Sequence, residues 1–225
     1  TLNHNLLISL NHFSLGLLIE DASGKAFLER IIPLIIGNND VTYRIHGYRG
    51  IGRIPPGLAS RIDPSKRIIL DQLPRILAGY GKTPYIDAVV VIIDNDNRDC
   101  TAFLAELNRL ARHAAPMLRV LFRLAIEEME AWYFGDIEAV RAAYNNVNTA
   151  VVRSYTQDSI CGTWERMADA ITPGGSSRVI SQGWPASGIL KAEWAENIPP
   201  HMDVERNTSP SFKKLRDGVR ALISA

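Results

Sequence analysis

The sequence predicts an α/β fold in which a mainly parallel sheet of about four strands carries helices on both faces. Three observations predict it. Apolar runs that suit strands alternate with amphipathic segments that suit helices through residues 1–144. One of these runs, Ala88–Ile93, is entirely apolar, which is typical of a strand buried on both faces. The chain has 225 residues, of which 46% are hydrophobic and 22% charged, enough for one such domain with a modest extension.

Four segments have the pattern of strands. The first, Phe13–Ile19, is a Leu-rich run that ends at Glu20. In the second, Val41–Ile45, apolar and polar residues alternate, as expected for a strand with one buried face. The third is the apolar run Ala88–Ile93, and the fourth is Leu118–Ile126.

Helices are expected after each strand, at segments with apolar residues near the helical period. Gly37 closes the first helix, Pro74 is a potential kink in the second, and Asp99 is the expected N-cap of the third. The expected helices are Ala22–Ile36, Lys66–Tyr80, Thr101–Ala114 and Glu127–Tyr144.

Residues 145–225 differ in character from residues 1–144. Gly, Pro, Ser and Asn are frequent and the strand pattern is absent, so we predict a mostly helical or irregular extension packed on the first domain. Two helices stand out in it, Thr163–Ile171 and Ser211–Leu222. Ser209, followed by a proline, has the pattern of an N-cap before the second of them.

Charge and cysteine content exclude several classes of protein. The formal net charge of +1 excludes a strongly basic nucleic-acid binder, although residues 44–82 hold eight basic residues against two acids and could contact a polyanion. Cys100 and Cys161 are isolated, which excludes a disulfide framework, makes a zinc site improbable and suits a reducing cytoplasm. No apolar run approaches the ~20 residues of a membrane span, and the first residues lack the pattern of a signal peptide.

Carboxylates follow three of the four expected strands. Glu20 ends the first strand, Asp94 and Asp96 end the third, and Glu127 follows the fourth. Because ligands of open parallel sheets bind beyond the carboxyl ends of the strands, we expect these side chains to meet. Extended backbone would place Asp94 and Asp96 on one side, and such hard oxygen ligands, with Glu20, suit Mg²⁺ or Mn²⁺. The alternative for this pair is a helix cap with a turn acid.

Two further acids belong to the fourth expected helix. Glu127 and Glu130 would share one helical face, and one of the three acids Glu127, Glu128 and Glu130 is a candidate metal ligand or general base. The alternative is that they complement the helix dipole, as acids in a first turn do.

The second strand is followed by candidate phosphate contacts. His46 lies at its end, and Arg49 and Arg53 lie in the Gly-rich loop after it. Arginine binds phosphate through two parallel N–H groups, whereas a loop histidine is equally well explained by a turn hydrogen bond. The loop has no GxxxxGK[ST] pattern, which excludes a P-loop ATPase, and the chain has no G-x-S-x-G nucleophile elbow.

Longer stretches resemble two known families. The sequences LLIEDASGKAFLERIIPLI and VVVIIDND resemble the Toprim (topoisomerase–primase) domain, in which one strand ends in Glu and a later strand ends in Asp-x-Asp. The sequences YRIHGYRGIG, FRLAIEEMEAWYFGD and KAEWAENIPPHMD, followed by NTSPSFKKL, resemble the uncharacterised DUF4276 family, which is grouped with Toprim-like proteins. This resemblance extends from about Leu15 to Leu222.

The resemblance implies Mg²⁺-dependent phosphodiester chemistry on a Toprim-like sheet. Glu20 would be the general base or a metal ligand, and Asp94 and Asp96 would be metal ligands. Lys191, in the tail motif, would neutralise charge in the transition state, unless it is a surface lysine. The chain departs from many Toprim proteins after Glu20, because Ser23-Gly24-Lys25 stands where they carry a second acid.

Three functions remain open on these grounds. The first is a metal-dependent nuclease acting on DNA or RNA, similar to Toprim nucleases of the overcoming-lysogenization-defect class. The second is a non-catalytic or conditionally active effector subunit docked on a partner ATPase, since members of the family often occur beside ATPases in prokaryotic defence or mobile loci. The third is a phosphatase or nucleotidyl transferase that uses the same carboxylates.

Overall fold

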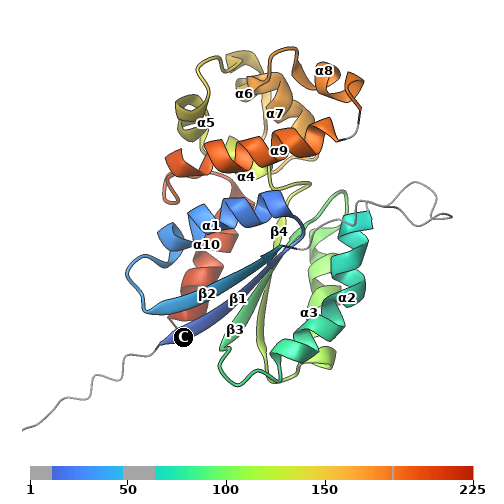
Figure 1. Cartoon of the computed structure of the whole chain (residues 1–225), viewed down its shortest axis with the longest axis vertical. Helices are drawn as coiled ribbons and strands as arrows, with labels where there is room; N and C mark the ends of the chain where they lie inside the picture. The colour runs from blue at the N-terminus through green and yellow to red at the C-terminus, as the bar shows by residue number, and fades with distance from the viewer. Residues whose placement is uncertain (1–11, 48–63, 184, 225) are drawn as a thin grey trace, which may run out of the picture.

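A four-stranded, all-parallel sheet forms the centre of the molecule. The computed structural model describes residues 12–47, 64–183 and 185–224 (Figure 1). The strand order is β2-β1-β3-β4, and all three neighbouring pairs are parallel. The α/β class and the parallel sheet predicted from the sequence are therefore confirmed. The strands are β1 (Phe13–Ile19), β2 (Val41–Gly47), β3 (Ala88–Asp94) and β4 (Arg119–Ala125).

The register brings the carboxyl ends of the strands to one edge. Ile19, the last residue of β1, is paired with Gly47 of β2 on one side and with Ile92 of β3 on the other. Asp94, the last residue of β3, is paired with Ala125 of β4. The residues that directly follow β1 and β4 therefore lie close to Asp94.

Helices cover both faces of the sheet (Figure 1). On one face lie α2 (Pro64–Tyr80) and α3 (Cys100–Ala114), and Asp99 caps α3 as predicted by accepting the Ala102 N–H at 2.7 Å. On the other face lie α1 (Ala22–Ile36) and α10 (Pro210–Ile223), the last helix of the chain. Long apolar side chains alternate along β1 and β3, so each face of the sheet has its own hydrophobic core.

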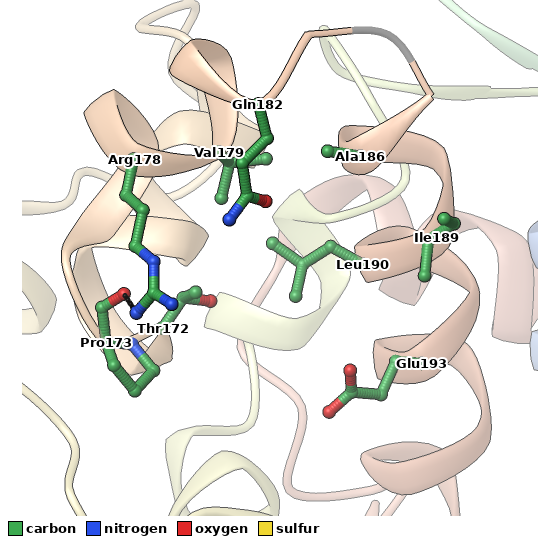
Figure 2. Close-up of a pocket in the computed structure, with 9 residues that line it drawn as sticks. All are labelled: Thr172, Pro173, Arg178, Val179, Gln182, Ala186, Ile189, Leu190 and Glu193. Carbon is green, nitrogen blue, oxygen red and sulfur yellow. Dashed lines mark hydrogen bonds between the residues drawn. The ribbon is translucent and has the colours of Figure 1, made fainter.

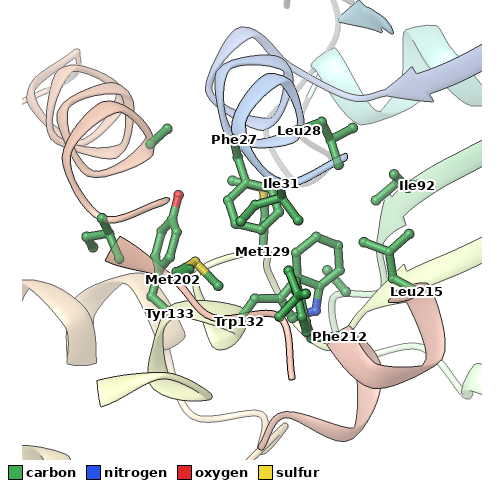
Figure 3. Close-up of a cluster of buried hydrophobic side chains, with 14 of the residues drawn as sticks. Phe27, Leu28, Ile31, Ile92, Met129, Trp132, Tyr133, Met202, Phe212 and Leu215 are labelled. Atoms are coloured by element: carbon green, nitrogen blue, oxygen red, sulfur yellow. The ribbon is translucent and has the colours of Figure 1, made fainter. Parts of the chain in front are cut away.

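Aromatic side chains join the tail to the core between α1 and α10 (Figure 3). The ring of Trp132 lies 5.4 Å from that of Phe27 in α1 and 5.9 Å from that of Phe212 in α10. Its indole N–H donates to Ser211 Oγ at 2.8 Å, which satisfies the polar atom of a fully buried side chain. Ser209 caps α10 as predicted, accepting the Phe212 N–H at 3.2 Å.

The tail is more helical than the sequence predicts. The expected helix at Thr163–Ile171 is present as α7, whereas α6, α8 and α9 were not predicted. These helices gather with α4 and α5 at the end of the molecule shown uppermost in Figure 1. The division into residues 1–144 and 145–225 stays a prediction. The elements are α4 (Ala131–Phe134), α5 (Ile137–Ala143), α6 (Thr149–Ser154), α7 (Thr163–Ile171), α8 (Gly175–Ser181), α9 (Ala186–Asn197) and the 3-10 helix Pro199–His201.

The single helix predicted at Glu127–Tyr144 is wrong. A turn precedes α4, and the helical conformation is interrupted at Gly135, between α4 and α5. The break has a tertiary cause, because a Cβ at Gly135 would lie 2.0 Å from Asn207 Oδ1. The Asn207 side chain donates to the Trp132 carbonyl at 2.8 Å, and Thr208 N donates to the Gly135 carbonyl at 2.8 Å. The carbonyl groups of Trp132 and Gly135 therefore accept hydrogen bonds from the tail, whereas in a continuous helix they would accept them from within the helix.

Within the described ranges, no helix combines the length and apolar character that crossing a membrane requires.

Candidate functional site

A small pocket at the carboxyl ends of β1 and β3 holds four of the site residues predicted from the sequence. Four carboxylates and one ammonium group line it, and its volume is about 20 Å³. We call it the acidic pocket. It brings together Glu20, Asp94, Glu130 and Lys191, which come from four separate parts of the chain. Its lining residues are Ile19, Glu20, Asp21, Ser23, Gly24, Ile92, Asp94, Met129, Glu130 and Lys191.

Glu20 and Asp21 form the wall of the acidic pocket at the start of α1. Glu20 directly follows β1 and is buried. Asp21 is the N-cap of α1 and accepts hydrogen bonds from Gly24 N at 2.7 Å and Ser23 Oγ at 2.9 Å. The sequence analysis missed Asp21 as a site residue, although an Asp three residues before a Gly at a strand-to-helix junction is a recognisable capping signal.

Asp94 and Asp96 lie in different surroundings. Asp94 ends β3 and lines the acidic pocket, whereas Asp96 does not line it. The extended backbone expected to keep both carboxylates on one side ends before Asp96, whose φ is +52°. Its N–H donates to the Glu127 carbonyl at 3.1 Å, which fixes this turn against the chain after β4.

Lys191 reaches the acidic pocket from α9 in the tail. Its ammonium nitrogen lies 3.0 Å from Glu128 Oε1 and 3.5 Å from Glu130 Oε2. Burial raises the pKa of the Glu130 carboxyl, and Glu128 adds to this rise while Lys191 opposes it. Burial by itself would lower the pKa of Lys191, but Glu130, Glu128 and Asp94 outweigh it and the pKa is raised. Lys191 therefore stays charged.

Glu128, one of the three candidate acids after the fourth expected strand, forms the shorter of the two ion pairs with Lys191. Its Oε1 accepts from Lys191, and its Oε2 accepts the Trp164 N–H at 3.2 Å. The sequence around Glu127, Glu128 and Glu130 contains no local signal that shows which of these acids faces the acidic pocket. That choice depends on the backbone conformation at Glu127.

The Glu127 carboxylate anchors the start of α7. Glu127 and Glu130 do not share a helical face, which corrects the expectation, because Glu127 precedes the helix and has a φ of +59°. Its carboxylate accepts the backbone N–H groups of Cys161, Gly162 and Thr163 at 2.9–3.0 Å, together with the Thr163 hydroxyl. Burial acts to raise the pKa of Glu127, but these hydrogen bonds prevail and lower it. A carboxylate that accepts from four donors complements the N-terminus of α7, and its role as a metal ligand or base stays a prediction.

The candidate phosphate contacts lie apart from the acidic pocket or outside the described residues. His46 is exposed near the end of β2, with its ring centroid 6.5 Å from that of Tyr80. Partial burial, Arg44 and Lys25 lower the pKa of His46. Arg49 and Arg53 fall outside the described residues, so their predicted roles stay predictions.

The donor chemistry of the acidic pocket fits a hard divalent cation, because Mg²⁺ and Mn²⁺ prefer carboxylate oxygens. Its geometry is not that of a preformed centre. Among the residues that the structure describes, no group of three or more His, Cys, Asp or Glu side chains could hold a metal ion as arranged.

A second, larger hollow lies between α7, α8 and α9 (Figure 2). This groove has a volume of about 400 Å³ and a mostly apolar lining. Arg178 donates to the Pro173 carbonyl at 3.3 Å on one side, and Glu193 lies across from it on α9. With one acid and one base, the groove lacks the carboxylate density of the acidic pocket.

Fold and site together define an α/β protein with a carboxylate pocket at the strand ends, completed by a helical tail. The chain belongs to the family described as a domain of unknown function (DUF4276), whose model matches residues 19–220. The matched residues include the acids at the strand ends and Lys191. They also include Asn207 and Thr208, the tail residues that contact the chain between α4 and α5. No curated protein and no solved structure matches the chain. The expected relationship to Toprim domains stays a prediction.

Proposed function

We propose that the protein is a Mg²⁺- or Mn²⁺-dependent nuclease that hydrolyses phosphodiester bonds of DNA or RNA at the acidic pocket. One observation carries this proposal: Glu20, Asp94 and Glu130 meet Lys191 in one pocket at the carboxyl ends of β1 and β3. In parallel sheets this edge is where ligands bind. A role in a prokaryotic defence or mobile-element system follows from the family resemblance alone.

Asp94 is the residue proposed to hold the metal, with Asp21 and Glu130 close by, and Glu20 is proposed as the general base beside it. The expectation that Asp96 is also a ligand stays a prediction, since it does not line the pocket. A divalent cation bound to such carboxylates supplies charge stabilisation to the phosphate and acidity to a bound water.

The chain's own side chains have separate roles in the proposed hydrolysis. Glu20 accepts the proton of the attacking water as the new oxygen–phosphorus bond forms and the bond to the leaving oxygen breaks. The leaving oxygen takes a proton from solvent. Lys191 places a fixed positive charge beside the negative charge that develops on the phosphate. Arg44 and His46, exposed on β2, suit contacts with the more distant backbone of a polyanion.

A second function is favoured by the groove between α7, α8 and α9. Ile189 lines it and is 67% exposed, and Ile180 nearby is 61% exposed. Exposed apolar side chains around a groove suit a protein contact, so the alternative is an effector that docks on a partner ATPase and acts only in the complex. A phosphatase or nucleotidyl transferase remains a third proposal, and a phosphomonoester and nucleotide screen separates it from the first.

A cytoplasmic location is part of the proposal. Cys100 and Cys161 are both free, and Cys161 is exposed, as suits a reducing compartment.

Nuclease assays of the purified full chain test the proposed function. Plasmid, single-stranded DNA and RNA are each incubated with Mn²⁺, with Mg²⁺ and with a chelator. We expect metal-dependent cleavage of at least one substrate, and its loss in Asp94→Asn. Glu193→Gln, a carboxylate change in the groove, is the matched control and retains cleavage. Intact substrates under every metal condition would contradict the nuclease and favour the docked effector.

A further inference from the structure

Lys191 occupies a position among the carboxylates that resembles that of a bound cation. Its nitrogen lies 3.0 Å from Glu128 Oε1 and 3.5 Å from Glu130 Oε2. The negative charge of Asp94 also favours the charged form of the lysine. Its side chain is only 20% exposed. Among the described residues that line the acidic pocket, it is the one positively charged group.

The space beside Lys191 is small. The acidic pocket has a volume of about 20 Å³, whereas one water-sized body needs roughly 10–15 Å³. Two-metal sites hold their ions about 3.5–4 Å apart, commonly between shared carboxylates. Here the oxygens of Glu128 and Glu130 that would serve a second ion already face an ammonium group.

The helix that carries Lys191 is firmly held. Trp194, one turn further along α9, is fully buried, and so is Ala195. Helix α9 packs against α1, which begins at the acidic pocket with Asp21. The ammonium group is therefore fixed relative to Glu20 and Asp94 and does not depend on a mobile surface side chain.

We infer that Lys191 supplies the second positive charge of the acidic pocket, so that the pocket takes a single divalent cation. This inference rests on the proposed function and specifies it: one metal ion and one ammonium group stand where a two-metal nuclease has two ions. It also gives the tail a direct part in the site, because residues 1–144 do not contain this cation.

Counting bound Mn²⁺ tests the inference without any activity measurement. The full chain is titrated with Mn²⁺, and bound metal is followed by calorimetry and electron paramagnetic resonance. We expect one ion per wild-type chain, with the hyperfine pattern of an isolated Mn²⁺ rather than of a spin-coupled pair. In Lys191→Met we expect two ions, because the Glu128 and Glu130 oxygens become available to a second one.

Two variants control the count. Lys191→Met/Glu128→Gln should return to one ion, since the negative carboxylate that the lysine had neutralised is replaced by a neutral amide. Lys25→Met removes a lysine that is 45% exposed on α1 and should leave one ion.

The outcomes separate the two proposals. Two ions, or a spin-coupled pair, in the wild type would overturn the inference and leave the nuclease standing. One ion in a folded Lys191→Met would also overturn it. No bound ion in the wild type would overturn both. If Lys191→Met does not fold, the wild-type count and spectrum alone decide between one ion and two.

Discussion

The two hollows that α9 borders differ in size and in chemistry. Toward the strand ends, Lys191 enters an acidic pocket of about 20 Å³ that is lined by four carboxylates. Toward α7 and α8, Leu190 and Glu193 line a groove of about 400 Å³ that holds one acid and one base (Figure 2). The smaller hollow thus holds most of the charged side chains, and the larger one holds few. Charges held in a small, water-poor space interact more strongly than the same charges on an open surface.

The largest expected difference between the two hollows is in catalysis. Glu20→Gln keeps the shape of the side chain but removes the proposed proton acceptor, so cleavage should fall by about a hundred- to ten-thousandfold. Glu193→Gln makes the same chemical change in the groove and should leave the rate unchanged. Initial rates of cleavage at saturating Mn²⁺ measure both. Equal losses in the two variants would remove the distinction between the hollows.

The next difference is in stability, between neighbouring residues of α9. Lys191→Met leaves Glu128 and Glu130 without their counter-ion and should cost about 3 kcal/mol of unfolding free energy in metal-free solution. Leu190→Ala, on a half-buried residue of the groove, should cost about 1 kcal/mol. Urea unfolding with a chelator present measures both changes.

The Lys191→Met deficit should also depend on pH. Burial already raises the pKa of Glu130, and removing the lysine raises it further. The folded state then binds protons that the unfolded state releases, so stability falls as pH rises through this range. The deficit should therefore be smaller in mildly acidic than in mildly alkaline solution. A deficit that does not change with pH would mean that Lys191 matters through packing and not through charge.

A smaller effect is expected from the acid that does not face the acidic pocket. Glu127→Gln weakens the anchoring of α7 and should cost about 2 kcal/mol near neutral pH. The pKa of Glu127 is lowered in the folded state, so its contribution is complete above its ordinary value of 4.5 and is lost as pH falls below that. The wild-type and variant unfolding curves should converge in acid.

A matched change checks the specificity of the Glu127 effect. Glu138→Gln removes an exposed partner of Arg141 and should change stability by less than about 0.5 kcal/mol at any pH. If both variants lose the same unfolding free energy, the hydrogen bonds that Glu127 accepts from the start of α7 stabilise the fold no more than an exposed ion pair does.

The sequence predicts the sheet side of the acidic pocket well, for a local reason. Apolar periodicity gives the ends of β1 and β3, and parallel pairing then brings Glu20 and Asp94 to one edge. The prediction of α1 as Ala22–Ile36 agrees with the structure at both ends, because Asp21 and Gly37 are strong local signals for its start and end. The ends of the two strands and of α1 depend on neighbouring residues alone.

The tail side of the acidic pocket depends on contacts far apart in sequence. Helix α9 was not predicted, and Lys191 meets Glu128 across 63 positions. Whether Glu127 or Glu130 faces the pocket depends on a positive φ at Glu127, and the hydrogen bonds to Cys161, Gly162 and Thr163 accompany that conformation. Nothing within the run of acids specifies such a contact, so sequence pattern alone could not choose between them.

The smallest expected effect lies at the rim of the groove. Ile189 is 67% exposed, so Ile189→Ser should change the unfolding free energy by less than about 0.5 kcal/mol and leave Mn²⁺ binding and cleavage by the isolated chain unchanged. Urea unfolding and initial rates measure these. Because Ile189 lies two residues before Lys191 on α9, a clear change in Mn²⁺ affinity would show that the groove and the acidic pocket communicate through this helix. The two hollows would then be one functional unit, and the groove would be a place from which a bound partner controls the position of Lys191.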